Sequence, residues 1–145
     1  MIAVDSNILI YAAHSNSPWH EKAETCLIEL AESEAPWAIP WPCIHECLGV
    51  ITNPRTYKPT MTIADALDQI ERWMESPSLR VIGESPGYWQ RLRHLMQSGQ
   101  VVGSMVHDAK IASICLHHGV DVLWSADRDF QRFPQLKTMN PLIKR

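Results

Sequence analysis

Short apolar runs that end close to an aspartate restrict the fold of this chain more than any other feature. Asp5 follows the run Met1-Ile-Ala-Val, and Asp127 stands just beyond the run Val122-Leu-Trp. Such runs are typical of buried strands in a parallel sheet, and the residues after them lie at the carboxyl edge, where ligands bind in α/β folds. We therefore expect both aspartates at one edge of a parallel sheet.

Asp108 adds a third carboxylate, this time within a predicted helix. It stands on the apolar side of that helix, at helical spacing from Met105, Ile111, Ala112 and Cys115. An unpaired carboxylate is costly in such a place. Acidic groups that converge raise one another's pKa unless a cation neutralises them, and oxygen ligands suit Mg²⁺ or Mn²⁺ better than Zn²⁺. These positions predict a divalent-cation site.

The composition limits the classes of protein to consider. The chain has 145 residues, of which 46% are hydrophobic, and no charge block or low-complexity segment, so we expect a single domain over residues 1–145. It lacks a signal-peptide pattern and any apolar stretch that spans a bilayer, so we expect a cytoplasmic protein without a membrane partner. A net charge of −3 gives no overall attraction to nucleic acid, so a polyanionic substrate needs a local patch and a metal.

The cysteines do not form a disulfide framework. In a reducing compartment they are expected to be small apolar core residues, at positions Cys26, Cys43, Cys47 and Cys115. The segment Cys43-x-His45-x-Cys47 could be read as part of a zinc site, but it lacks a second ligand pair at suitable spacing.

The order of elements predicts an α/β fold. Apolar runs alternate with capped amphipathic stretches, which favours a mostly parallel sheet of about five strands flanked by helices. The predicted strands are 1–5, 37–39, 79–82, 122–124 and 136–139. Helices are predicted from 7 to 13, from Ser17-Pro18, from Pro42 to Asn53-Pro54, from a Thr62 cap to Met74, from Ser85-Pro86 to near Gly99, and from a Ser104 cap to Gly119.

The acidic residues, taken in order, resemble the PIN-domain pattern over essentially the whole chain. The matching motifs are Asp5-Ser-Asn7 after the first strand, Glu46 after the second, Asp108 before the fourth, and Ser125-Ala-Asp127-Arg-Asp129-Phe after it. The stretches VDSNILIYA and SADRDF look most like the VapC toxins of bacterial and archaeal toxin–antitoxin pairs. The resemblance implies a three-layer PIN-like α/β fold.

The same resemblance implies an activity. In that family the residues that match Asp5, Glu46, Asp108 and Asp127 hold Mg²⁺ or Mn²⁺ for endoribonucleolytic cleavage, often of tRNA or rRNA. Phosphodiester hydrolysis needs an activated water, neutralised phosphate charge and help for the leaving oxygen, and metal ions held by carboxylates supply all three. Ser125 keeps the hydroxyl of the family's usual Thr.

Three further residues are expected to assist, and four to contact RNA. Asp129 is predicted to be an accessory ligand or to act behind the direct ligands, and Ser125 is a predicted accessory residue. Asn7 is predicted to orient a carboxylate or water, although local turn bonding is equally consistent. The best stretch for holding RNA by charge and stacking contains Arg55, Tyr57 and Lys58, with Arg128 as a further contact, although a solvated loop is equally consistent.

The resemblance also implies a small antitoxin, because a free nuclease of this kind would be toxic. An Arg or Lys of the antitoxin is expected to enter the acidic site and displace metal. The apolar faces of the second and fourth predicted helices, including Leu30 and Trp73, are candidate surfaces for that partner or for a homodimer, unless they are ordinary core.

Other interpretations of the same residues stay open. Asp5 could simply cap a helix, Glu46 lies opposite an apolar face as a solvated glutamate does, and Asp108 could pair with Lys110 or Arg128. The chain could be a PIN nuclease of RNA processing without an antitoxin, or a non-catalytic RNA-binding module. A haloacid dehalogenase type of phosphohydrolase expects a second Asp where Asn7 stands.

Overall fold

The computed structural model describes residues 1–143 and contains one five-stranded sheet. The strands are β1 (Ile2–Val4), β2 (Trp37–Pro40), β3 (Leu79–Ile82), β4 (Val122–Trp124) and β5 (Lys137–Met139). Their order is β3-β2-β1-β4-β5, and each neighbouring pair is parallel. The predicted fold class, a three-layer α/β fold with about five mostly parallel strands, is confirmed.

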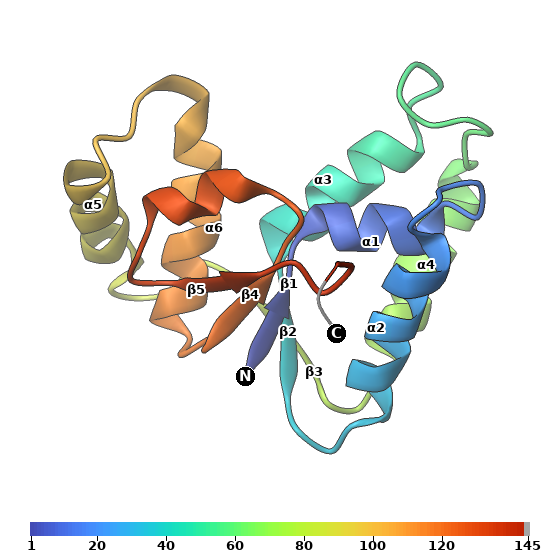
Figure 1. Cartoon of the computed structure of the whole chain (residues 1–145), viewed down its shortest axis with the longest axis horizontal. Coiled ribbons are helices and arrows are strands. Elements are labelled where there is room, and N and C mark those ends of the chain that lie inside the picture. Colours follow the sequence, from blue (N-terminus) through green and yellow to red (C-terminus); the bar gives the residue numbers. More distant parts are fainter. Residues whose placement is uncertain (144–145) are drawn as a thin grey trace.

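Helices cover the sheet on both faces. They are α1 (Ser6–Ala13), α2 (His20–Glu32), α3 (Trp41–Ile51), α4 (Ile63–Met74), α5 (Tyr88–Ser98) and α6 (Val106–His117), with short 3₁₀ helices η1 (Gly103–Met105) and η2 (Arg128–Arg132). In Figure 1, α5 and α6 lie on one side of the strands and α1, α2 and α4 on the other. Each layer buries its apolar side against the sheet, as the parallel topology requires.

The order of the strands reverses at β1. From β1 the chain first builds the sheet outward through β2 and β3, and then returns to the other side of β1 for β4 and β5. The crevice at the carboxyl end of the strands, where such a reversal occurs, is the usual ligand site of open α/β sheets. In this chain that crevice lies between the ends of β1 and β4.

The core explains why the strands are short apolar runs. Ala3, Val4 and Leu123 have no exposed surface, because the central strands are covered by helices on both faces. All four cysteines are buried, as predicted. Among the tryptophans, Trp37 and Trp124 belong to the core, whereas Trp41 and Trp89 are exposed.

Three predicted helix starts are wrong by a few residues, because turns take the place of caps. Ser17 and Pro18 form a turn in which the Ser17 carbonyl accepts from the His20 amide at 3.1 Å, and α2 begins at His20. Residues 85–88 form a type II β-turn with Pro86 at its second position and Gly87 at φ 94°. Ser104 lies inside η1 and gives α6 no side-chain cap.

No helix within residues 1–143 is both long enough and apolar enough to cross a membrane.

Candidate metal centre

Two strand ends and one helix bring the aspartates together at the crevice between β1 and β4. Asp5 directly follows β1, and its amide donates to the carbonyl of Trp124 at 3.0 Å, which continues the ladder to the end of β4. Asp127 lies three residues beyond Trp124, and Asp108 lies in the first turn of α6. Three segments far apart in the sequence therefore supply carboxylates to one edge of the sheet.

The closest group of acids consists of Asp108, Asp127 and Asp129. One ligand atom of each lies within 4.8 Å of those of the other two. Asp127 caps η2, because its Oδ1 accepts from the Asp129 amide at 2.8 Å. That turn places the carboxylates of Asp127 and Asp129 beside that of Asp108.

Asp5 lies beneath this group, is buried, and is held by hydrogen bonds to both oxygens. Its Oδ1 accepts from the Ser6 amide at 2.7 Å, and its Oδ2 accepts from the Ser125 hydroxyl at 2.7 Å. Asp5 thus caps α1, as the alternative interpretation expected. The cap uses Oδ1, whereas Oδ2 faces Ser125 and Asn7 at the end of β4, so Asp5 is both a helix cap and part of the acidic group.

Asn7 and Ser125 connect the ends of the two strands. The Asn7 amide nitrogen donates to Asp5 Oδ2 at 3.2 Å and to Ser125 Oγ at 3.1 Å, and Asn7 Oδ1 accepts from the Ala126 amide at 3.1 Å. Ser125 Oγ also accepts from the Asp127 amide at 3.0 Å. The network fixes Asp5 and Asp127 relative to each other.

Cys43 is a contact that the sequence did not reveal. It lies on α3, fully buried, and its thiol donates to Asp5 Oδ1 at 3.4 Å. Its place one helical turn before Glu46 was the available signal, since residues i and i+3 share a helix face.

Burial and mutual repulsion raise the pKa values of the acids. The pKa of Asp108 rises to about 6, because of burial and then the charges of Asp127, Asp5, Asp129 and Glu46. Burial also raises the pKa of Asp5, against the effect of its hydrogen bonds from Ser125, Ser6 and Cys43. Such a group keeps its full negative charge only if a cation compensates it, and otherwise some of its carboxyls bind protons.

Glu46 belongs to the same electrostatic field, although its side chain is exposed on α3. Burial and the charge of Asp5 raise its pKa, and Asp127 adds to the rise. The expected position opposite an apolar helix face is correct, since Ile44 and Ile51 are buried. The exposed face of α3 is thus turned to the acidic group rather than away from it.

The residues predicted to contact RNA occupy different environments. Arg55 and Lys58 are exposed in the loop after α3, and Arg128 is exposed next to Asp127. Tyr57 is only 3% exposed, and its ring packs on His14 with centroids 4.2 Å apart. The Tyr57 ring therefore offers no free face to a base in this structure, which contradicts its predicted stacking role.

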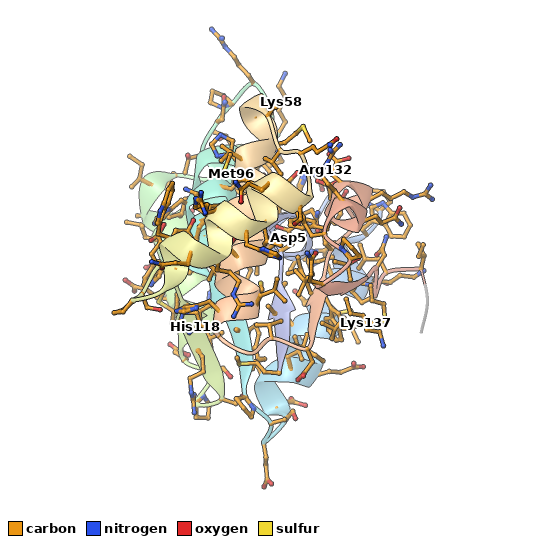
Figure 2. The ribbon with its side chains drawn as sticks, turned by 90° about the vertical axis from the view of Figure 1, so that its left-hand side faces the viewer. Asp5, Lys58, Met96, His118, Arg132 and Lys137 are labelled. Carbon is orange, nitrogen blue, oxygen red and sulfur yellow. The ribbon has the colours of Figure 1, made fainter. Side chains whose placement is uncertain are left out.

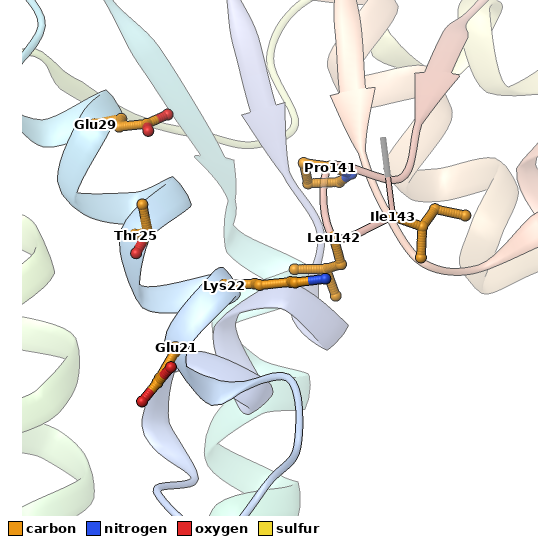
Figure 3. Close-up of a pocket in the computed structure, with 7 residues that line it drawn as sticks. All are labelled: Glu21, Lys22, Thr25, Glu29, Pro141, Leu142 and Ile143. Carbon is orange, nitrogen blue, oxygen red and sulfur yellow. The ribbon is translucent and has the colours of Figure 1, made fainter. Parts of the chain in front are cut away.

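The donor set fits a hard divalent cation. It contains only carboxylates, and no Lys110 or Arg128 salt bridge to Asp108 occurs among residues 1–143. A cavity of about 90 Å³ adjoins the acids and is lined by Met105, Asp108, Asp129, Arg132 and Phe133. A wider cavity of about 680 Å³ lies apart from the acids, between α2 and residues 141–143, where Lys22 reaches towards Leu142 (Figure 3).

Comparison with known protein families identifies the class to which this fold and its acidic group belong. Residues 2–136 match the model of the PIN domain, so the chain belongs to the PIN domain family, as its motifs predicted.

The named relatives of this chain are ribonucleases. It is 30% identical over 137 residues to Ribonuclease VapC48 of Mycobacterium tuberculosis, a match that covers 94% of each chain. It is 28% identical over 142 residues to Ribonuclease VapC43 of the same species, covering 98% of this chain and 96% of that one.

Solved structures share the fold at low sequence identity. VapBC2 from Rickettsia felis, bound to a DNA fragment from its promoter, gives a TM-score of 0.65 at 22% identity and covers 96% of this chain and 98% of that one. Mycobacterium tuberculosis VapC20, described as a Sarcin-Ricin loop cleaving toxin, gives 0.65 at 16% identity and covers 90% and 93%. At these identities the likeness establishes the fold alone.

Proposed function

We propose that this chain is a metal-dependent endoribonuclease that acts as the toxin of a toxin–antitoxin pair in the cytoplasm. The observation that carries the proposal is the convergence of Asp108, Asp127 and Asp129 above the buried Asp5, at the strand crossover of a PIN domain. The ribonuclease names of the relatives support the substrate class.

The acids divide into two groups in the proposed site. Asp5, Glu46, Asp108 and Asp127 are the proposed ligands of Mg²⁺ or Mn²⁺, and Asp129, whose carboxylate lies beside those of Asp108 and Asp127, is the proposed accessory ligand. When bound, the metal supplies an activated water and neutralises charge on the phosphate and the leaving oxygen. Asn7 and Ser125 hold Asp5 and Asp127 in place, which is a positioning role.

The side-chain hydroxyls at the site are not suited to act as nucleophiles. Ser125 Oγ donates to Asp5 and accepts from Asn7 and from the Asp127 amide, so its lone pairs and proton are already engaged. Ser6 Oγ donates to Asp5 at 3.4 Å. The activating base of a serine nucleophile is typically His, and neither hydroxyl has a hydrogen bond to a histidine within the described part of the chain. Water is therefore the proposed nucleophile.

The products of cleavage test the chemistry. In-line attack by water leaves a 5′-phosphate and a 3′-hydroxyl, whereas attack by the neighbouring 2′-hydroxyl leaves a 2′,3′-cyclic phosphate. Total RNA is incubated with the purified chain in Mg²⁺ or in EDTA, and the ends are mapped by ligation-dependent sequencing. Full cleavage in EDTA, or cyclic phosphate ends, would contradict the mechanism, and Asp108→Asn controls for contaminating nucleases.

The groove between α2 and α4 is the proposed docking site of the antitoxin. A cavity of about 340 Å³ opens there, with an apolar lining that includes Leu27, Ile28 and Trp73. Its charged lining residues are Glu24, Arg72 and Glu75, of which two are acidic. Acidic residues are concentrated on both helices, at Glu21, Glu24, Glu29, Glu32, Asp65, Asp68 and Glu71. An amphipathic helix with basic flanks fits this groove. Leu30, predicted at this surface, is buried in the core.

Growth of the host tests the toxin role apart from the nuclease role. Induction of the chain alone is expected to stop growth, and Asp5→Ala is expected to relieve the arrest. Equal growth of the two strains, with soluble protein present in both, would contradict the toxin role and leave an RNA-processing nuclease. The homodimer remains part of the proposal, and sedimentation of the free chain measures it.

A further inference from the structure

The charge of this chain is unevenly distributed, and one helix beside the metal centre is basic. From Ser85 to His107 there is no Asp or Glu, while Arg91 and Arg93 are present on α5. Both arginines are exposed, and neither forms a salt bridge with another residue of the described chain. A segment of this kind suits a polyanionic ligand.

The exposed face of α5 combines an aromatic ring, a cation and an amide. Trp89, Arg93 and Gln97 stand at successive i, i+4 positions, which places them along one side of the helix. All three are exposed, and Trp89 has 62% of its surface free. Leu95 on the other side is buried, so the exposed tryptophan does not belong to the packing of the helix.

This face leads to the metal centre through Arg132. Figure 2 views the molecule from the α5 side and places Arg132 beside the end of that helix. Arg132 Nη1 donates to the Gly99 carbonyl at 3.3 Å, just beyond the carboxy-terminal end of α5. The same arginine lines the cavity of about 90 Å³ that contains Asp108 and Asp129. Its guanidinium is held next to the acids without a salt bridge to them.

We propose that single-stranded RNA lies along the exposed face of α5 and enters the metal centre beside Arg132. The proposal rests on the nuclease function and adds the path of its substrate. Trp89 stacks on a base, Arg93 and Arg132 bind phosphates, and Gln97 donates to the strand. From Trp89 to Gln97 the helix rises about 12 Å, which is long enough for a short run of nucleotides.

Charge favours RNA over a second copy of the chain on this surface. A symmetric contact centred on Trp89 would bring Arg91 and Arg93 of two copies close to one another, and the segment offers no acid to pair with them. RNA brings a phosphate for each arginine and a base for the ring. The bound RNA would also bring its negative charge to the side of the acidic centre where the positive charge of Arg132 compensates that of the RNA.

Binding of a labelled RNA tests the path separately from cleavage. A fluorescein-labelled, mixed-sequence single-stranded RNA of about 12 nucleotides is titrated with the full chain, with Ca²⁺ in place of Mg²⁺ to limit cleavage. We expect Trp89→Ala to bind about tenfold more weakly. Arg93→Gln and Arg132→Gln should each reduce the salt dependence by about one unit of slope. The matched controls are Ile63→Ala and Arg80→Gln, which remove an exposed apolar group and an exposed charge elsewhere.

Steady-state cleavage adds a second measurement. With Mg²⁺, Trp89→Ala should raise KM and leave kcat near the value of the unmodified chain, because Trp89 contacts the strand away from the reacting phosphate. Thermal unfolding of every variant reports whether it is folded. If Trp89→Ala and Arg93→Gln bind RNA as well as the two controls while the unmodified chain cleaves it, the path is wrong.

Two other results separate the possibilities. If Trp89→Ala converts a dimer to a monomer in sedimentation and leaves RNA affinity unchanged, the face is a contact between copies, and the proposal is overturned. If the unmodified chain cleaves no RNA in Mg²⁺ but its binding in Ca²⁺ depends on Trp89 and Arg93, the nuclease function fails and the RNA surface stands.

Discussion

Asp108 is the residue at which burial and charge conflict most clearly in this chain. Its pKa is raised to about 6 by burial and by the charges of Asp127, Asp5, Asp129 and Glu46. The folded chain therefore holds a carboxylate that repels its neighbours at neutral pH, and a bound cation would remove that repulsion. A residue kept under such conditions is better explained by a role in metal binding than by a role in stability.

Removing the charge of Asp108 should separate activity from stability. Asp108→Asn keeps nearly the same shape, so the fold should persist, and in metal-free buffer at neutral pH the midpoint of thermal unfolding should be equal to or above that of the unmodified chain. Because a direct ligand is lost, cleavage should fall by more than the roughly 10- to 100-fold typical of outer groups. Rates and unfolding midpoints measured side by side check both parts, and normal cleavage would return Asp108 to a structural role.

The pH dependence of stability follows from the same shift. A carboxyl whose pKa rises from 3.8 to about 6 on folding binds a proton in the folded chain that the unfolded chain has already released. The folded state is therefore less stable as pH rises through that window. In EDTA, the unfolding midpoint should fall between about pH 4 and about pH 6, and saturating Mg²⁺ should reduce the fall. A midpoint that rises over this interval without metal would be incompatible with the clustered acids.

At the scale of residues, the sequence predicted positions better than contacts. Asp5 and Asp127 could be placed because each follows an apolar run, and Asp108 because of its helical offsets. The proximity of Asp129 to Asp108 was not predicted, because it arises from the geometry of η2 and no periodic pattern records a 3₁₀ turn. Tyr57 was wrongly expected at the surface, since its partner His14 is distant in the sequence. The ligand roles themselves stay predictions.

Among the elements, the ends of β1 and β4 matter most for the geometry of the acidic group. Side-chain hydrogen bonds join these two ends in addition to the backbone hydrogen bonds of the sheet. The Ser125 hydroxyl contacts Asp5, Asn7 and the Asp127 amide at once. Loss of this one group would leave a buried Asp5 oxygen with fewer donors and would free the turn that carries Asp127. The ends of these two strands are thus part of the acidic site.

A pair of substitutions at Ser125 tests the joint between the strands. Ser125→Ala removes the hydroxyl and should weaken Mg²⁺ affinity and cleavage by about 10- to 100-fold. Ser125→Thr keeps the hydroxyl and should retain most of both. Calorimetric titration with Mg²⁺ gives the affinity without relying on activity, and equal affinities of the Ala and Thr variants would argue that the joint does not position the ligands.

The elements themselves were largely predictable, and their starts were not. The strand at 79–82 was placed correctly, as was the strand at 122–124, because both are short segments of mainly apolar residues bounded by turn residues. Proline was read as the first residue of two helices, but Pro18 and Pro86 lie in turns that precede α2 and α5. Proline fits both places equally well, since its fixed φ suits a turn and a first helical turn alike.

At the scale of the whole molecule, charge and topology divide the surface into separate regions. The reversal of strand order places the acids between β1 and β4, which no single stretch of sequence could reveal. The acidic groove of α2 and α4 lies on one side of the sheet, and the basic α5 on the other (Figure 1). The proposed antitoxin and the proposed RNA would therefore occupy different surfaces and meet only at the metal centre.

This separation predicts a toxin that escapes its antitoxin yet still cuts RNA. Ile28 lines the α2–α4 groove and is 47% exposed, so Ile28→Lys should fold, leave the metal centre unchanged and place a charge where an apolar helix face would dock. Cells that express this variant with the co-encoded antitoxin should remain arrested, whereas Ile63→Lys, on a residue that is 73% exposed on α4 outside the groove lining, should be neutralised as the unmodified chain is. Growth curves and co-purification of the antitoxin measure the outcome. Neutralisation of the Ile28 variant, with cleavage intact, would move the antitoxin to another surface.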